Sequence, residues 1–216
     1  HPVWKEQLMA GDVSTDTARA VGQVLGELHA ASAGKAGLAA AFDTTDNFRA
    51  LRLDPYLVAT AQRHPALSAP LTALAEHTAG LRIALVHGDT SPKNILVGPR
   101  GPVLLDAECA WYGDPAFDLA FCLNHLMLKC LARPDRIVAL LAAFATLTDA
   151  YFGRAGWEPR EGLEERAARL LPALLLARID GKSPVEYVSD EVQQEVVRAF
   201  ALPVVLRSVS RLSLVA

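Results

Sequence analysis

A polar loop between short apolar runs decides the fold: residues 85–97 read LVHGDTSPKNILV, and residues 103–106 read VLLD. The runs Ile95–Val97 and Val103–Leu105 flank a five-residue stretch with two glycines and two prolines, GPRGP. Gly and Pro are the strongest turn formers, and apolar runs on either side of a turn are typical of paired strands. We therefore expect the two runs to form a β-hairpin.

This hairpin would bring three polar side chains together. Asn94 stands just before its first strand and Asp106 just after its second, so their side chains become neighbours at the open end. Asp89 precedes Asn94 by five residues and is close enough to face the same space. Two carboxylates and an amide oxygen suit Mg²⁺ better than zinc or copper. Since Mg²⁺ usually takes only one or two protein carboxylates, Asp89 could instead orient or deprotonate a hydroxyl.

The rest of the chain is predicted to be mainly helical, which gives an α+β fold with one small β insert. Residues 1–13 are expected to be irregular, 38–54 to be loop with short helical pieces, and 81–86 to be a short strand. Pro172 and Pro203 should kink or split the last two helices. Apolar spacing, capping residues and breakers predict helices over residues 14–32, 55–63, 66–79, 116–131, 134–152, 160–179 and 189–212.

Composition excludes several classes of protein. The chain has 216 residues, of which 51% are hydrophobic, enough for one domain or one large lobe with a substantial core. The net charge of −3, with no run of like charge, argues against a nucleic-acid partner. The longest apolar run, residues 137–147, is too short to cross a membrane. Three cysteines without CxxC spacing, and no signal peptide, favour the cytoplasm. The oligomeric state cannot be predicted.

Three motifs follow one another in order within residues 85–121: HGD at residues 87–89 with Asn94, LLD at 104–106, and GDPAFDLA at 113–120. This set resembles the aminoglycoside phosphotransferase and choline-kinase-like family. The preceding stretch LGELH, residues 25–29, resembles the first large helix in the C-terminal lobe of that family. The resemblance implies a protein-kinase-like fold, of which this chain would be the predominantly helical C-terminal lobe.

The resemblance also implies roles for five residues. Asp89 would be the catalytic base, and Asn94 and Asp106 would be the Mg²⁺ ligands. His87 would support the catalytic loop, and Asp118 would accept hydrogen bonds from its backbone N–H groups. ATP or GTP would be the phosphate donor, as in kinases.

The N-terminal β-lobe of such a kinase is not found in this sequence. That lobe would supply a glycine-rich loop and a strand lysine, and the family ordinarily has about 100 residues for it before the position of His1. Residues 1–13 resemble the segment that follows the hinge between the lobes. Residues 14–216 would then form the helical lobe that carries catalysis and acceptor binding.

Several further side chains are candidates for binding the acceptor, the nucleotide or the metal. Asn124 and His125 interrupt an apolar run and could reach the acceptor, or could be a hydrogen-bonded pair in the core. Arg178 and Asp180 could line the acceptor site, or could be solvated at a helix end before Gly181. Secondary candidates are Lys93, which could touch a phosphate, and Glu108, which could help to hold the metal.

The function expected from these residues is ATP-dependent, Mg²⁺-assisted phosphoryl transfer to a hydroxyl of a small molecule, either an antibiotic or a metabolite. One alternative is a non-catalytic, kinase-like binding module without a working nucleotide-binding lobe. Another is a metal-dependent hydrolase that directs the same carboxylates at water. The intact set of Asp89, Asn94 and Asp106 favours the phosphotransferase.

Overall fold

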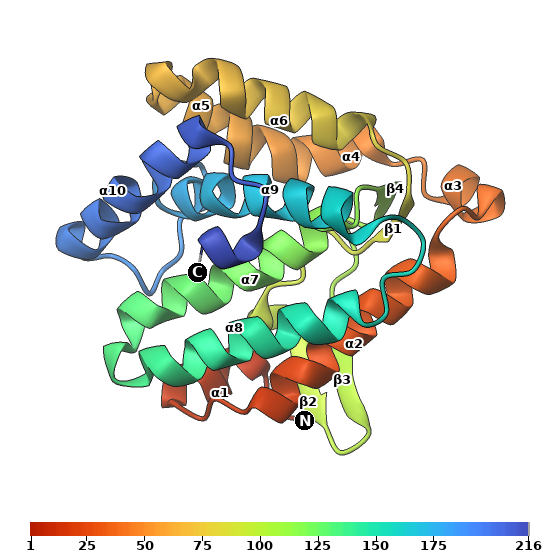
Figure 1. Ribbon diagram of the computed structural model, residues 1–216, viewed down its shortest axis with the longest axis horizontal. Helices are drawn as coiled ribbons and strands as arrows, with labels where there is room; N and C mark the ends of the chain where they lie inside the picture. The colour runs from red at the N-terminus through yellow and green to blue at the C-terminus, as the bar shows by residue number, and fades with distance from the viewer. Residues whose placement is uncertain (216) are drawn as a thin grey trace.

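The computed structural model describes residues 1–215 as a helical body with two small sheets (Figure 1). The first half of the chain contains α1 (Trp4–Ala10), α2 (Thr15–Ser32), α3 (Ala36–Ala41), α4 (Thr45–Phe48), the π-helix η1 (Arg49–Val58), α5 (Ala59–Arg63) and α6 (Ser68–Gly80). The second half contains α7 (Ala116–Ala132), α8 (Ile137–Phe152), α9 (Arg160–Asp180) and α10 (Glu191–Arg207). Short 3₁₀ turns are η2 (Pro65–Leu67), η3 (Pro92–Asn94), η4 (Pro134–Arg136) and η5 (Leu212–Leu214).

Both sheets have two antiparallel strands. The expected hairpin is confirmed: β2 (Ile95–Gly98) pairs with β3 (Gly101–Leu104), and Ile95 lies opposite Leu104. The second sheet pairs β1 (Ala84–Val86) with β4 (Trp111–Gly113). Because β1 leads into the polar loop and β4 leads into α7, this pairing holds the loop beside the start of α7.

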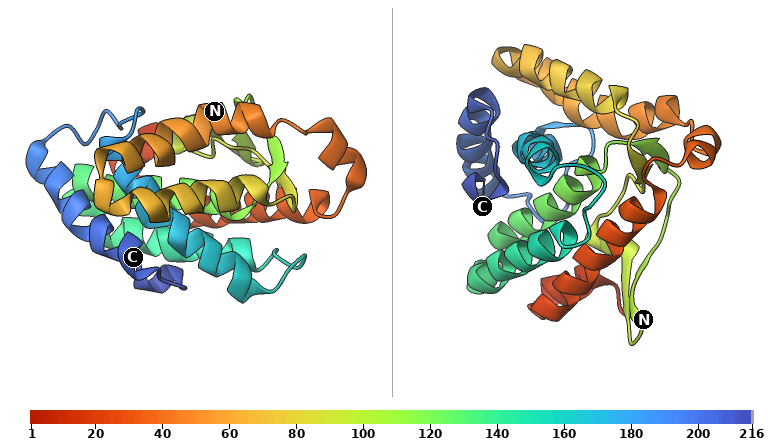
Figure 2. Two further views of the ribbon diagram at one scale, coloured as in Figure 1. Left: turned by 90° about the horizontal axis from the view of Figure 1, so that it is seen from above. Right: turned by 45° about the vertical axis from the view of Figure 1, so that its right-hand side comes forward.

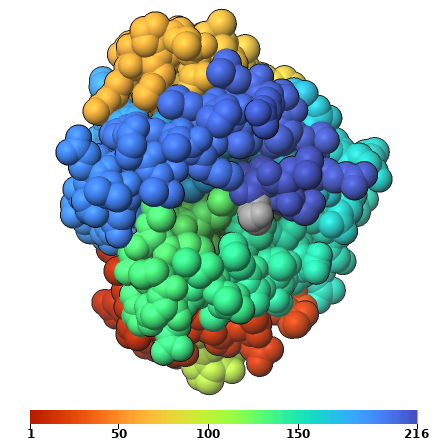
Figure 3. Space-filling view, turned by 60° about the vertical axis from the view of Figure 1, so that its left-hand side comes forward, coloured from red at the N-terminus to blue at the C-terminus, as the bar shows by residue number. Residues whose placement is uncertain are grey.

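Helix α9 runs through the middle of the molecule (Figure 1). It packs against α7 on one side, against α5 and η1 on another, and against α10. Figure 2 shows the β2–β3 hairpin extending from the helical body on the side where the N-terminus lies. In Figure 3, α10 (blue) covers one face between the gold α5–α6 region and the green to teal α7 and α8. Nearly every residue of the central α7 and α9 segments is buried, as expected for helices apolar all round.

The N-terminal segment differs from the prediction, because residues 4–10 form α1 instead of an irregular stretch. Trp4 and Leu8, four residues apart, are both buried and give this short helix one apolar face. Gly11 ends it in the left-handed conformation (φ 87°). The chain before it is also ordered: Val3 pairs with Leu96 of the hairpin.

The helix predicted over residues 55–63 begins much earlier, at Thr45, and includes a ten-residue π-helix with Pro55 inside it. A proline has no N–H to donate, and the sequence pattern gives no sign of the wider turns that accommodate it. Pro172 and Pro203 likewise lie inside the continuous helices α9 and α10, which are not split. Helix α10 ends at Arg207, five residues before the predicted end.

No helix within residues 1–215 is both long and apolar enough to span a membrane.

Candidate active site

The polar loop after β1 is held in an unusual backbone conformation. Gly88 has φ 80°, which disfavours any side chain, and a Cβ there would lie 2.6 Å from the carbonyl oxygen of Cys109. Only glycine fits this close approach. Position 88 therefore requires a glycine if the loop is to adopt its observed conformation.

Asp118, in the first turn of α7, anchors this loop. Its completely buried carboxylate accepts hydrogen bonds from the backbone N–H groups of His87 (2.7 Å) and Gly88 (2.9 Å). Nε2 of His29 lies 3.2 Å from the same carboxylate. Burial alone would raise the pKa of Asp118, but the hydrogen bond from His29 and the nearby His29 and His87 hold this pKa below its usual value. Thr90 adds a hydrogen bond to the backbone oxygen of Asp118 (2.8 Å).

His87 is part of the same loop support, and its ring is almost completely buried. Its Nδ1 accepts the backbone N–H of Asp89 at 3.2 Å. The backbone N–H of His87 itself donates to Asp118, so hydrogen bonds fix the loop at both His87 and Asp89. The backbone of Asp89 is thereby fixed before any ligand arrives.

The carboxylate of Asp89 is 5% exposed and faces two cations. Oδ2 lies 2.9 Å from Nη2 of Arg52 and 3.5 Å from Nζ of Lys93. Arg52 also donates from Nε to the carbonyl oxygen of Gly88 at 2.6 Å. This guanidinium therefore fixes both the side chain of Asp89 and the backbone next to it.

Asn94 and Asp106 stand at the open end of the hairpin, where the backbone N–H of Leu105 donates to the carbonyl oxygen of Asn94 (2.8 Å). The side-chain amide of Asn94 donates to the backbone oxygen of Asp89 at 3.2 Å, which leaves its oxygen as a potential metal ligand. Asp106 is exposed and adopts the left-handed conformation (φ 64°), which aspartate tolerates better than most residues.

These residues fit Mg²⁺. Within residues 1–215, no group of three or more His, Cys, Asp or Glu side chains is arranged to hold a metal by itself. Mg²⁺ needs no such cage, because it takes one or two carboxylates and fills its other positions with water and substrate phosphates. Asp106 and Glu108 are exposed on the rim of the same pocket as Asp89 and offer the hard oxygen atoms that Mg²⁺ prefers.

A pocket of about 230 Å³ collects most of the predicted site residues. Six predicted residues line it: Asp89, Lys93, Asp106, Glu108, His125 and Arg178. Five further lining residues were not predicted: Arg52, Tyr56, Ser91, Phe121 and Ser183. The pocket therefore joins η1, the polar loop, the segment after β3, α7 and the end of α9.

Two predicted acceptor residues lie elsewhere. Asn124 is completely buried in α7 and donates to the carbonyl oxygen of Phe121 (2.5 Å), so it belongs to the core. Asp180 is buried and receives hydrogen bonds from Arg198 (2.9 Å), while His64 lies 2.8 Å away. This carboxylate joins α9 to α10 and to the end of α5, and neither residue lines the pocket.

Arg52 and Tyr56 have a signal in the sequence. Phe48, Arg52 and Tyr56 follow one another at intervals of four, so the arginine shares a helix face with two aromatic residues. All three are buried. A charged residue on an apolar helix face needs a partner, and here the partner is Asp89.

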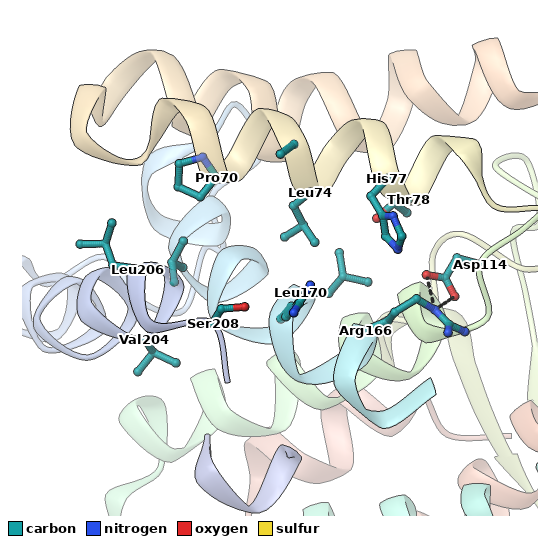
Figure 4. A pocket seen from close by; sticks show the side chains of 13 residues that line it. Pro70, Leu74, His77, Thr78, Asp114, Arg166, Leu170, Val204, Leu206 and Ser208 are labelled. Atoms are coloured by element: carbon teal, nitrogen blue, oxygen red, sulfur yellow. Dashed lines mark hydrogen bonds and ion pairs between the residues drawn. The ribbon is translucent and has the colours of Figure 1, made fainter. Parts of the chain in front are cut away.

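A larger pocket, of about 440 Å³, lies between α6, α9 and α10, away from the polar loop (Figure 4). Its lining is mostly apolar, with the ion pair of Asp114 and Arg166 (3.1 Å) at one end. The pKa of Asp114 is raised, because the effect of burial exceeds the lowering effect of the Arg166 guanidinium. Because Asp114 also accepts the backbone N–H of Ala116 at the start of α7, we interpret the ion pair as structural.

Lys129 of α7 is completely buried near the candidate site, and burial lowers its pKa to about 7. An unfolded lysine titrates near 10.5, so between pH 7 and 10.5 the unfolded state binds more protons than the folded state. The free energy of unfolding should therefore rise with pH across this window. We expect Lys129→Met to flatten that rise, measured by urea unfolding at several pH values.

The exposed Lys182 provides the control, because Lys182→Met should keep the slope of the unmodified chain. An unchanged slope in Lys129→Met would contradict the buried state of this amine.

The fold and the site together define a mainly helical α+β protein in which a rigidly held loop carboxylate lines the same pocket as oxygen donors suited to Mg²⁺. Phosphoryl transfer uses this arrangement. The chain belongs to the phosphotransferase enzyme family, whose model matches residues 3–156. This match confirms the resemblance that the motifs indicate, and it supports a transferase activity in general. A comparison with curated proteins finds no match.

Proposed function

We propose that this chain catalyses transfer of the γ-phosphoryl group of ATP or GTP to a hydroxyl of a small molecule, with Mg²⁺. Family membership supports the reaction class. The observation that carries the proposal is the position of Asp89, immobilised by Arg52 and the anchored loop at the wall of a pocket that also holds Asp106 and Glu108. Pre-positioning and charge neutralisation are what phosphoryl transfer requires of a protein.

Asp89 would act on the acceptor. Its carboxylate accepts the proton of the acceptor hydroxyl while the hydroxyl oxygen bonds to the γ-phosphorus. The bond between this phosphorus and the bridging oxygen breaks, and the nucleoside diphosphate leaves with that electron pair. Asn94 and Asp106 would hold Mg²⁺, which neutralises charge on the phosphates when bound. Glu108 would assist at the metal and Lys93 at the phosphates, and both residues line the pocket.

The same proposal covers the place of this chain in the kinase-like fold. Residues 14–216 would form the C-terminal lobe, and residues 1–13 the segment that follows the interlobe hinge. Residues 2–3 contact β2, and the N–H of Val97 donates to the carbonyl oxygen of Pro2 (2.9 Å). These contacts support a segment that is held in one position against the hairpin, as expected next to a hinge. We further propose that the chain acts in the cytoplasm and on small molecules. The three cysteines without CxxC spacing support the location, and the net charge of −3 supports a partner other than nucleic acid.

Calorimetric titration with Mg·ATP tests the nucleotide and metal site. We expect saturable binding, weakened at least about tenfold in Asp106→Ala because the variant loses a metal carboxylate. Asp12→Ala, an exposed carboxylate in the turn after α1, is the matched control and should bind like the unmodified chain. Equal binding by the Asp106 variant would contradict the assigned metal site. Absence of binding by the unmodified chain would contradict a working nucleotide site in these residues alone, and a repeat of the titration with a kinase N-terminal lobe restored would separate an incomplete kinase from a non-catalytic module.

A further inference from the structure

Charges in the 230 Å³ pocket are arranged in two groups. The two exposed carboxylates, Asp106 and Glu108, follow β3 and lie on the hairpin side. Arg178 reaches the pocket from the last turn of α9, and Asp89 is already paired with Arg52. If the hairpin carboxylates serve the metal, the remaining charge that faces the pocket is positive.

Arg178 is fixed in place but has no ion-pair partner within the described residues. Nη1 donates to the hydroxyl of Tyr56 (2.9 Å) and to the carbonyl oxygen of Ser183 (2.5 Å). Both are neutral acceptors, and Nε is buried without any hydrogen-bond partner. A guanidinium held in one orientation with unsatisfied donors is suited to a planar anionic group.

His125 lies on the same pocket wall and has a buried, unpartnered Nε2. Its Nδ1 lies 2.8 Å from the hydroxyl of Tyr187, and Nζ of Lys129 lies 3.4 Å from that hydroxyl and 4.4 Å from the centre of the ring. Lys129 keeps N–H donors in either protonation state, so its amine donates to the Tyr187 oxygen. Tyr187 then donates to Nδ1, which places the imidazole proton on Nε2.

The surroundings of His125 keep this ring neutral and favour a ligand of opposite charge. Burial lowers its pKa well below the ordinary value, and Lys129, Arg178, Lys93 and Lys5 add to the effect. Lys5 is paired with Glu186 and Lys93 with Asp89. The positive potential at this wall therefore comes mainly from Arg178, so an anion beside it gains and an ammonium group loses.

We propose that the acceptor is a small hydroxylated anion whose carboxylate or phosphate group binds to Arg178 and the Nε2–H of His125 while its hydroxyl lies at Asp89. This inference rests on the proposed function, since it names the substrate class of the same pocket. It disfavours polycationic acceptors, because their ammonium groups would lie near Arg178 and Lys93. The carboxylates of the pocket would already be engaged, Asp89 by Arg52 and the other two by the metal.

Four probes that share a hydroxylated three-carbon skeleton test the sign of the charge: glycerate, glycerol 3-phosphate, glycerol and 3-amino-1,2-propanediol. Each is titrated into the full chain, and binding is followed through the NMR signals of ¹⁵N-labelled histidine side chains. We expect at least one anion to bind at least about tenfold more tightly than glycerol, and the amine to bind most weakly. Whether glycerate or the phosphate binds better identifies the anionic group.

Variants link the binding to the two side chains. Arg178→Met should weaken binding of the anion about tenfold or more and leave that of glycerol unchanged. His125→Ala should weaken it severalfold, and His125→Gln, which keeps an N–H donor, should restore part of the loss. Arg207→Met, an exposed arginine at the end of α10, is the control. If Arg178→Met does not fold, Tyr56→Phe removes the hydroxyl that orients Arg178 and should weaken the anion severalfold.

The inference is overturned if glycerol or the amine binds as tightly as the anions or more tightly. It is also overturned if Arg178→Met leaves the affinity for the anion unchanged, or if no probe shows saturable binding. The Mg·ATP titration separates this failure from failure of the proposed function, because its site does not use Arg178. Retained Mg·ATP binding without anion preference would reject only the acceptor class. Anion binding without Mg·ATP binding would reject phosphoryl transfer by these 216 residues alone and leave the acceptor class standing.

Discussion

Asp89→Asn is expected to reduce phosphate transfer by about a hundred- to ten-thousandfold while leaving Mg·ATP binding nearly unchanged. The amide is the same size as the carboxylate but cannot take the proton of the acceptor hydroxyl, and general bases contribute rate factors of this order. The measurement is kcat for the best acceptor found, with product identified by mass spectrometry. A loss in kcat rather than in nucleotide affinity distinguishes a base from a phosphate-binding residue.

Two controls accompany this variant. Asp12→Asn makes the same chemical change at an exposed position and should retain full activity. Arg52 loses its ion-pair partner in Asp89→Asn, so thermal unfolding should show whether the folded state persists. Transfer within a few-fold of the unmodified chain would remove Asp89 from the mechanism. Hydrolysis of ATP by the unmodified chain that needs no added hydroxyl acceptor, and that is lost in Asp89→Asn, would favour a hydrolase that activates water.

Asp118→Asn should have the largest effect on stability, lowering the free energy of unfolding by about 2–4 kcal/mol. The carboxylate is completely buried and accepts two backbone N–H groups of the catalytic loop as well as the contact with His29. An asparagine can turn an oxygen toward only some of these donors and leaves the others buried without a partner. Displacement of His87 and Gly88 should also lower kcat at least about tenfold through misplacement of Asp89.

The pH dependence of this variant provides an independent check. The pKa of Asp118 is lowered in the folded state, so its contribution to stability is complete above the unfolded value near 3.8. It is lost as the pH falls through the lower, folded value. Urea unfolding from pH 6 down to acid should therefore show a shallower loss in Asp118→Asn than in the unmodified chain. Parallel curves, or a variant as stable as Asp12→Asn, would contradict the anchoring role.

The sequence predicts those parts of this fold that depend on local patterns. Helix α2 begins beside Ser14, whose side chain accepts the N–H of Thr17, as the capping residues indicate. The hairpin forms because two apolar runs are separated by Gly and Pro. Its closure brings the backbone of Asn94 against Leu105, which places Asp106 next to it. The turn alone therefore predicts that the backbone at these two positions lies close together.

The parts that were not predicted depend on contacts between distant segments. Strand β4 has three residues and pairs with β1 some 25 positions earlier, too short a segment to show an alternating pattern. Arg52 is part of the site because it forms an ion pair with Asp89. Asp180 is not part of it, because its carboxylate is bound by Arg198 and His64 instead. Which partner a charged group finds depends on tertiary packing, and local sequence does not encode it.

The pocket walls come from Arg52 near one end of the chain and Ser183 near the other, and the N–H of Lys182 donates to the carbonyl oxygen of Pro55 (2.9 Å). A ribosome releases these segments in order, and the N-terminal part of a chain can fold first. The loop around Asp89 can close on Asp118 well before Ser183 is synthesised. Under the proposed function, the acceptor side of the pocket is completed late in biosynthesis, after the loop around Asp89 has formed. A nascent chain that stops before α9 would contain Asp89 and His125 but lack Arg178.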